Sequence, residues 1–305
     1  METLSWNYDK VEKGKIYLSS AQKCYLMSRN IALGFIDRAI ECFFPLKSAR
    51  CDLAHCYYFK ACLLWNENQD LAKEFYIKSI EFDILGSKRG YYKSQRFYKF
   101  VGVDIKYIDS ILNRIQLQHP SKFNDPMDCP IASDSDNGIP DINLLNSLRV
   151  GCFGVVKNSM QEYYLNASKW SYYGDFHKGI CIEYDFSKLE FDELTLMDKV
   201  NYVPEYDPTN GIVKGALLTK SKDYNHENEW RIIWYDRSWI SKGIEEPQYI
   251  NIHPSMIQKI YIGFKCPVEI KEYIMRFQQE NSHIKVFQIS PSKENYYKLT
   301  ASILS

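Results

Sequence analysis

The chain has 305 residues, long enough for two domains, and its 45% hydrophobic and 25% charged residues are ordinary values for a globular protein. Lysines and arginines number 38, as do aspartates and glutamates, and this balance argues against general binding to nucleic acid or to an anionic membrane. Nine cysteines without a C-x-x-C pair fit reduced, buried thiols better than disulfides or a zinc site.

The start of the chain, METLSWNYDKVEKGK, has no apolar signal segment, and no apolar run in the sequence is long enough to cross a membrane. We therefore expect a cytoplasmic protein with no membrane segment. The motifs G-x-x-x-x-G-K-[ST], H-E-x-x-H and G-x-S-x-G are absent, which makes P-loop phosphotransfer, zincin proteolysis and α/β-hydrolase chemistry poor candidates.

Residues from about Gly14 to Asp83 have a helical pattern that repeats at an offset of 33 residues. The offset superimposes Ala21 on Ala54 and Ala39 on Ala72, small residues that let packed helices approach closely. The stretch DLAHCYYFKACLLWNENQDLAKEFYIKSIEFD resembles a tetratricopeptide repeat, although it lacks the usual first-helix glycine and the closing proline. So few repeats bury too little surface to stand alone, so we expect the helical block to pack against the rest of the chain.

The resemblance to tetratricopeptide repeats implies that this block binds a protein target or regulator. The alternative is a plain helical bundle with no peptide groove. The polar segment GSKRGYYKSQ, from Gly86 to Gln95, marks the boundary between a helical domain of residues 1–90 and a second domain of residues 91–305.

The second domain has the pattern of a mixed α+β domain with six to eight short strands. Helices are predicted over 104–114, with Asp104 as N-cap, and over 166–174, 211–222 and 268–279. Strands are predicted over 97–101, 116–119, 150–157, 178–186, 194–203, 249–252, 257–262 and 284–289, with a further strand ending near Tyr235. The loop SDSDNG lacks the glutamate that closes a calcium loop, since Leu145 holds that place, and we predict no metal site.

The stretch KSKDYNHENEWRIIWY, residues 220–235, carries the clearest chemical signal. At the period of a strand, Glu227, Glu229 and Arg231 project from one face, and Trp230 and its alternate neighbours project from the core face. Two carboxylates and a guanidinium in a row suit a cleft that binds sugar hydroxyls or a phosphate. The alternative is a solvent-exposed sheet face with a cross-strand ion pair.

Two further polar clusters interrupt the predicted elements. The first is KFNDP, whose Asn124 and Asp125 either form a self-closing turn or contact a ligand. The second is WSYYGDFHKG, where Trp170 and Tyr173 supply rings for stacking and His177 a titratable imidazole, although a lone histidine is more often structural.

The motifs FYKF, FNDPMD, W-x-x-Y-x-x-x-HKG-x-x-IEYD and E-x-E-W-R-I-I, in this order from Arg96 to Asp236, resemble a bacterial family of uncharacterised domains, domain of unknown function twenty-nine seventy-one. Members commonly have an arginine just after the first motif, where this chain has Val101 and Gly102. The layout in turn looks like the split, mainly antiparallel sheet of ADP-ribosyltransferases, and this resemblance implies an α+β domain that binds and cleaves NAD.

The same resemblance implies roles for individual residues. Glu229 would face the cationic ribose that forms when the nicotinamide bond breaks, and Glu227 would orient the acceptor of ADP-ribose. The first strand would contribute Tyr98 and Lys99, and Trp170 or Tyr173 would stack on nicotinamide. His177 would be the third catalytic residue or would hold ribose or phosphate oxygens. The remaining polar residues would contact the cofactor: Asn124, Asp125 and Arg231.

Two other classes of function stay open from the sequence. Asp125, Glu227 and Glu229 with nearby lysines could form the magnesium site of a nuclease, against which the neutral net charge argues. The chain could also be a non-catalytic adaptor, in which the helices bind a partner and the sheet domain is a structural or ligand-sensing body.

Overall fold

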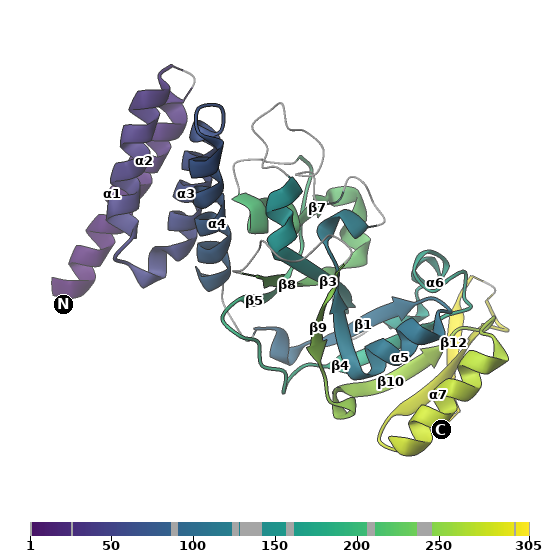
Figure 1. The fold of residues 1–305 in the computed structure, drawn as a ribbon. Coiled ribbons are helices and arrows are strands. Elements are labelled where there is room, and N and C mark those ends of the chain that lie inside the picture. Colours follow the sequence, from purple (N-terminus) through teal and green to yellow (C-terminus); the bar gives the residue numbers. More distant parts are fainter. Residues whose placement is uncertain are drawn as a thin grey trace.

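The computed structural model describes residues 2–25, 27–86, 91–123, 128, 142–156, 162–205, 211–236, 246–295 and 297–304. Within these ranges, four packed helices precede a mixed, mainly antiparallel sheet of eight strands, which confirms the predicted order of a helical block and an α+β domain (Figure 1). None of the described helices combines the length and the apolar character that a membrane crossing requires.

The helical block consists of two pairs of neighbouring helices: α1 (Glu2–Cys24) with α2 (Arg29–Phe43), and α3 (Arg50–Leu64) with α4 (Gln69–Gly86). The four alanines that the repeat superimposes, Ala21, Ala39, Ala54 and Ala72, are all buried. Their small side chains allow each pair of helices to approach closely, and this is the physical basis of the 33-residue spacing.

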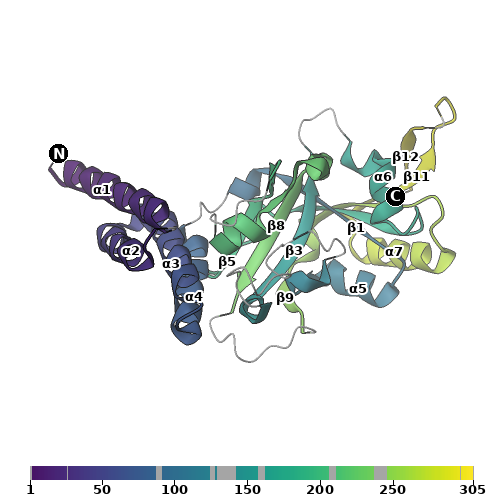
Figure 2. The ribbon, with the colours of Figure 1, turned by 90° about the horizontal axis from the view of Figure 1, so that it is seen from above.

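The second helical pair packs against the sheet domain, as the small size of the block led us to expect. Tyr58, Tyr76 and Ile80 share one hydrophobic cluster with Val150 and Ile233 of the sheet. A π-helical segment, η9 (Gly211–Leu217), contacts both α3 and α4. Seen from above, α3 and α4 lie between the first helical pair and strands β5 and β8 of the sheet (Figure 2).

The large sheet has the order β12-β11-β10-β4-β1-β3-β8-β5, and only β10 and β11 run parallel within it. Its strands are β1 (Arg96–Val101), β3 (Leu148–Val155), β4 (Ile180–Asp185), β5 (Thr195–Lys199), β8 (Glu229–Tyr235), β10 (Ile257–Ile262), β11 (Lys285–Pro291) and β12 (Leu299–Ile303). Two small pairs stand apart from it: β2 (Arg114–Leu117) with β9 (Gln248–Asn251), and β6 (Asn201–Val203) with β7 (Thr219–Ser221).

Several predicted elements differ in extent from those in the structure. The helix predicted over 211–222 is wrong after the seventh residue, because the chain leaves η9 and pairs as β7 with β6. The strand predicted over 116–119 is present as β2, which pairs with β9, and Gln118 just beyond it bridges Val150 of β3. The strand predicted over 194–203 is divided into β5 and β6, which belong to different sheets. The sequence also gave no sign of β12, a mostly polar edge strand that pairs with β11.

Helices cover both faces of the large sheet. The first face packs against α5 (Ile105–Asn113), which Asp104 caps as predicted by accepting from two backbone N–H groups, and against α7 (Val268–Glu280). The opposite face carries the short helix α6 (Ala167–Tyr172), whose Trp170 packs among Tyr98 and Tyr261.

The sheet opens between β1 and β3. Strand β1 pairs with β4 along its whole length, but its register with β3 joins only Phe97 to Val155 and Tyr98 to Gly154. Beyond these two pairs the ammonium of Lys99 donates to the backbone carbonyl of Cys152 at 3.2 Å. A side chain therefore occupies the place where strand pairing would otherwise continue, and a cavity opens at this point.

Candidate functional site

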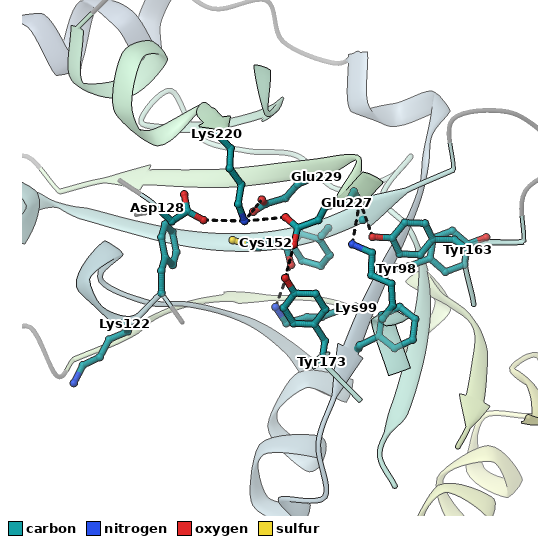
Figure 3. A pocket seen from close by; sticks show the side chains of 15 residues that line it. Tyr98, Lys99, Lys122, Asp128, Cys152, Tyr163, Tyr173, Lys220, Glu227 and Glu229 are labelled. Atoms are coloured by element: carbon teal, nitrogen blue, oxygen red, sulfur yellow. Dashed lines mark hydrogen bonds and ion pairs between the residues drawn. The ribbon is translucent and has the colours of Figure 1, made fainter. Parts of the chain in front are cut away.

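A cavity of about 270 Å³ lies at the opening between β1 and β3, on the face of the sheet that carries α6. Its wall combines aromatic rings with charged groups of both signs, and Figure 3 shows how these side chains converge. The lining residues that carry the chemistry are Tyr98, Lys99, Asp128, Tyr163, Lys169, Tyr173, Lys220, Glu227 and Glu229.

Lys220 lies at the centre of three carboxylates. Its ammonium is 2.8 Å from Glu227 Oε2, 3.1 Å from Asp128 Oδ2 and 3.8 Å from Glu229 Oε2, an arrangement visible in Figure 3. Burial lowers the pKa of Lys220, but the charges of Glu229 and Asp128 raise it more, so that the net shift is upward. The ammonium therefore stays charged and holds the carboxylates together.

Glu229 is fixed by a two-point contact with Arg231. Arg231 Nε donates to Glu229 Oε1 at 2.8 Å and Nη2 to Oε2 at 3.1 Å, while the same Nη2 bonds Asp128 and Nη1 bonds the Leu217 carbonyl. Burial by itself would raise the pKa of Glu229. The charge of the Arg231 guanidinium lowers the pKa by more than burial raises it, so that the net value is about 2. Arg231 is 0% exposed, so the alternative of a solvent-exposed ion pair is wrong.

Glu227 reaches the same cluster by a different route from the predicted one. It ends the 3₁₀ segment η10 (Lys222–Glu227), and Asn228 has the left-handed φ of 46° before β8 begins at Glu229. The prediction that Glu227 belongs to the strand row is therefore wrong, because the chain turns at Asn228. Its carboxylate still joins the cavity wall, where it accepts from the Tyr173 hydroxyl and from Lys220.

Lys169 is a buried charge of this wall that forms no ion pair among the described residues. Its side chain extends from α6, where Asn166 caps the helix, and the residue is only 4% exposed. The ammonium donates to the Glu227 backbone carbonyl at 3.4 Å and lies 5.2 Å and 5.4 Å from the ring centroids of Tyr163 and Tyr173. Burial lowers the pKa of Lys169 to about 8, although the carboxylates of Glu227 and Glu229 oppose the shift.

We expect Lys169→Met to raise the free energy of unfolding by about 1–3 kcal/mol at pH 7, because methionine removes a buried cation that contacts no carboxylate among the described residues. The pKa of Lys169 is about 8 in the folded protein, below the ordinary 10.5. Between pH 8 and 10.5 the lysine is neutral in the folded protein and charged in the unfolded chain, so the free energy of unfolding of the wild type rises over this range. The advantage of methionine should therefore shrink over that range in urea unfolding. Lys188→Met changes an exposed side chain, and its free energy of unfolding should stay within about 0.5 kcal/mol of wild type at pH 7 and at pH 10.5. A Lys169→Met protein that is less stable than wild type at pH 7 would contradict this account.

The structure brings together about half of the predicted site residues. Tyr98, Lys99, Tyr173, Glu227 and Glu229 line the cavity, and Arg231 contacts Glu229 from behind the wall. Asn124 and Asp125 lie outside the described residues.

Two predicted residues lie away from the cavity lining. Trp170 is fully buried and packs edge-on against Phe100, so it offers no open ring face for stacking. His177 has a left-handed φ of 70°, and its ring lies near Trp170 and Phe264 at 6.3 and 4.7 Å between centroids. Burial lowers the pKa of His177, and the charge of Lys265 lowers it further, which favours a neutral packed ring.

Sequence reasoning missed several residues of the wall, notably Lys169, Lys220, Asp128 and Tyr163. Lys169 could have been found from its place one turn before Tyr173 in the W-x-x-Y motif, since residues four apart share a helix face. Asp128 offered no such local signal, because it meets Arg231 across 103 residues of chain.

Comparisons of the chain with known proteins match no protein-family model, no curated protein and no solved structure. The chemistry of the cavity therefore decides which function to propose.

Proposed function

We propose that the chain is an enzyme that binds NAD in this cavity, breaks the bond between nicotinamide and ribose, and transfers ADP-ribose to an acceptor. One observation carries the proposal: the carboxylates of Glu227 and Glu229 lie together on the wall of a cavity at the opening of the sheet, which Tyr98 and Lys99 of β1 also line. This matches the motif order that resembles the uncharacterised domain family, and the split-sheet layout of ADP-ribosyltransferases.

The buried charges suit the chemistry of such a cleavage. When nicotinamide leaves with the bonding electron pair, positive charge develops on the ribose, and a fixed carboxylate stabilises it. Glu229 meets this need because Arg231 holds it in place and keeps it ionised. The acceptor then forms the new bond to the ribose carbon, and Glu227 orients the acceptor and takes up its proton.

Lys220 bears on the alternative of a metal-dependent nuclease. The ammonium of Lys220 is within 4 Å of all three carboxylates, in the place where a bridging metal ion would bind them. A cation supplied by the protein thus already lies between these carboxylates, and this favours NAD chemistry over a magnesium site. The tetratricopeptide-like helical block would help to select or restrain the acceptor.

The experiment that tests the proposal is nicotinamide release from NAD by the purified full chain, together with the melting temperature with and without NAD. We expect release above the spontaneous rate and a higher melting temperature, since a ligand that binds only the folded state stabilises it. A folded protein that neither releases nicotinamide nor melts higher with NAD would refute the proposal and favour the adaptor.

A further inference from the structure

The four lysines of the cavity wall differ in how their charge is balanced. Lys220 has three carboxylates within 4 Å, and Lys122 lies at the rim, where its ammonium points away from the cluster in Figure 3. Lys99 contacts the Cys152 carbonyl and lies 5.2 Å from the Phe153 ring centroid, and Lys169 contacts the Glu227 carbonyl and two tyrosine rings. Among the described residues, neither Lys99 nor Lys169 forms an ion pair.

A buried ammonium without a counter-ion costs free energy, and carbonyl and ring contacts offset only part of that cost. Lys169 is the sharper case because it is 4% exposed and yet lines an open cavity. The contacts hold the ammonium in position without neutralising it. A group of opposite charge in the cavity would complete its coordination.

We propose that Lys99 and Lys169 form the binding site for the diphosphate of the substrate. That this diphosphate belongs to NAD rests on the proposed function. The anion site itself rests on the two lysines, which form no ion pair among the described residues. Inorganic pyrophosphate and the diphosphate of a nucleotide share this chemistry, and separate titrations with inorganic pyrophosphate and with ADP-ribose distinguish the two.

The charged groups of the wall fall into two sets. Lys220 and Arg231 carry two positive charges and contact the three carboxylates. Lys99 and Lys169 form no ion pair among the described residues. A ligand that carries both an anionic group and a developing cation matches these two sets, as NAD does with its diphosphate and its nicotinamide ribose.

The lowered pKa of Lys169 makes anion binding depend on pH. The charged groups that face this ammonium are Glu227 and Glu229, which favour its charged form, and Lys220, which disfavours it, and the Tyr163 and Tyr173 rings lie over it. A bound phosphate favours the charged form, so binding raises the pKa of Lys169 and takes up a proton near pH 8. Affinity for the anion should therefore fall as the pH rises from 7 to 9.

The test is calorimetric titration of the full chain with inorganic pyrophosphate, ADP-ribose and nicotinamide riboside, which has no phosphate. Lys169→Met and Lys99→Met should each weaken pyrophosphate and ADP-ribose by about tenfold or more, the usual effect of losing a charged hydrogen bond. Neither variant should alter the affinity for nicotinamide riboside. Lys188→Met, the matched surface control, should stay within about twofold for all three ligands.

Melting curves of each variant show that it is folded. The dependence of affinity on pH separates a direct contact of Lys169 with the anion from a structural role. Wild-type affinity for ADP-ribose, whose diphosphate keeps a constant charge over this range, should fall between pH 7 and 9, and this slope should disappear in Lys169→Met. Lysine-dependent pyrophosphate binding without NAD cleavage would leave the anion site standing and refute the proposed enzyme. NAD cleavage with unchanged pyrophosphate and ADP-ribose affinity in both lysine variants would overturn the anion site alone, as would a folded wild type that does not bind pyrophosphate.

Discussion

Replacing Arg231 with methionine is expected to lower the free energy of unfolding by about 3–5 kcal/mol at pH 7. The guanidinium is fully buried and donates to Glu229, to Asp128 and to the Leu217 carbonyl. Methionine fills much of the same volume but leaves two carboxylates for which Lys220 is the remaining cation among the described residues. The loss therefore reflects stranded buried charges more than lost packing.

Urea unfolding followed by circular dichroism measures this change, with Arg276→Met on the exposed face of α7 as the matched surface control, expected within about 0.5 kcal/mol of wild type. The double variant Arg231→Met/Glu229→Gln should recover part of the loss because the stranded charge is removed.

The pKa of Glu229 is about 2 in the folded protein against an ordinary 4.5. The contribution of Glu229 to the free energy of unfolding is therefore complete above pH 4.5 and is lost as the pH falls towards 2. The difference in free energy of unfolding between wild type and Arg231→Met should become smaller over that range. A loss below about 1 kcal/mol at pH 7 would contradict the role of Arg231 as the anchor of the cluster.

Glu229→Gln is expected to reduce nicotinamide release from NAD by about 10²–10³-fold or more. Glutamine keeps the shape of the side chain but carries no charge to stabilise the cationic ribose. Because this interaction develops as the bond breaks, the effect should appear in kcat, while the affinity for NAD changes little. Initial rates over a range of NAD concentrations separate the two.

The variant also removes a partner of Arg231, so its melting curve must show that it is folded at the assay temperature. Glu272→Gln, an exposed carboxylate in the middle of α7, is the matched control and should keep wild-type rates. Glu227→Gln should reduce release less than Glu229→Gln does, because Glu227 acts on the acceptor. A folded Glu229→Gln protein with a rate within about threefold of wild type would remove Glu229 from the reaction.

The sequence alone determined the elements whose cause is local. The spacing of small residues such as Ala21 and Ala54 predicted the helical repeat, and Asp104 marked the start of α5 because capping needs only adjacent backbone N–H groups. The alternation of β8 placed Glu229 and Arg231 on one face, since the period of two is a property of the strand itself.

Only the tertiary structure decided how the candidate site is assembled. The left-handed turn at Asn228 takes Glu227 out of the strand, and the early end of pairing between β1 and β3 opens the cavity. Lys169 meets the Glu227 carbonyl across 58 residues of chain, and Asp128 meets Arg231 across 103. Periodicity and capping act over a few residues, whereas the balance of buried charges depends on which distant segments pack together. For this reason the sequence showed the two glutamates and Lys99 but not Lys169, Lys220 or Asp128.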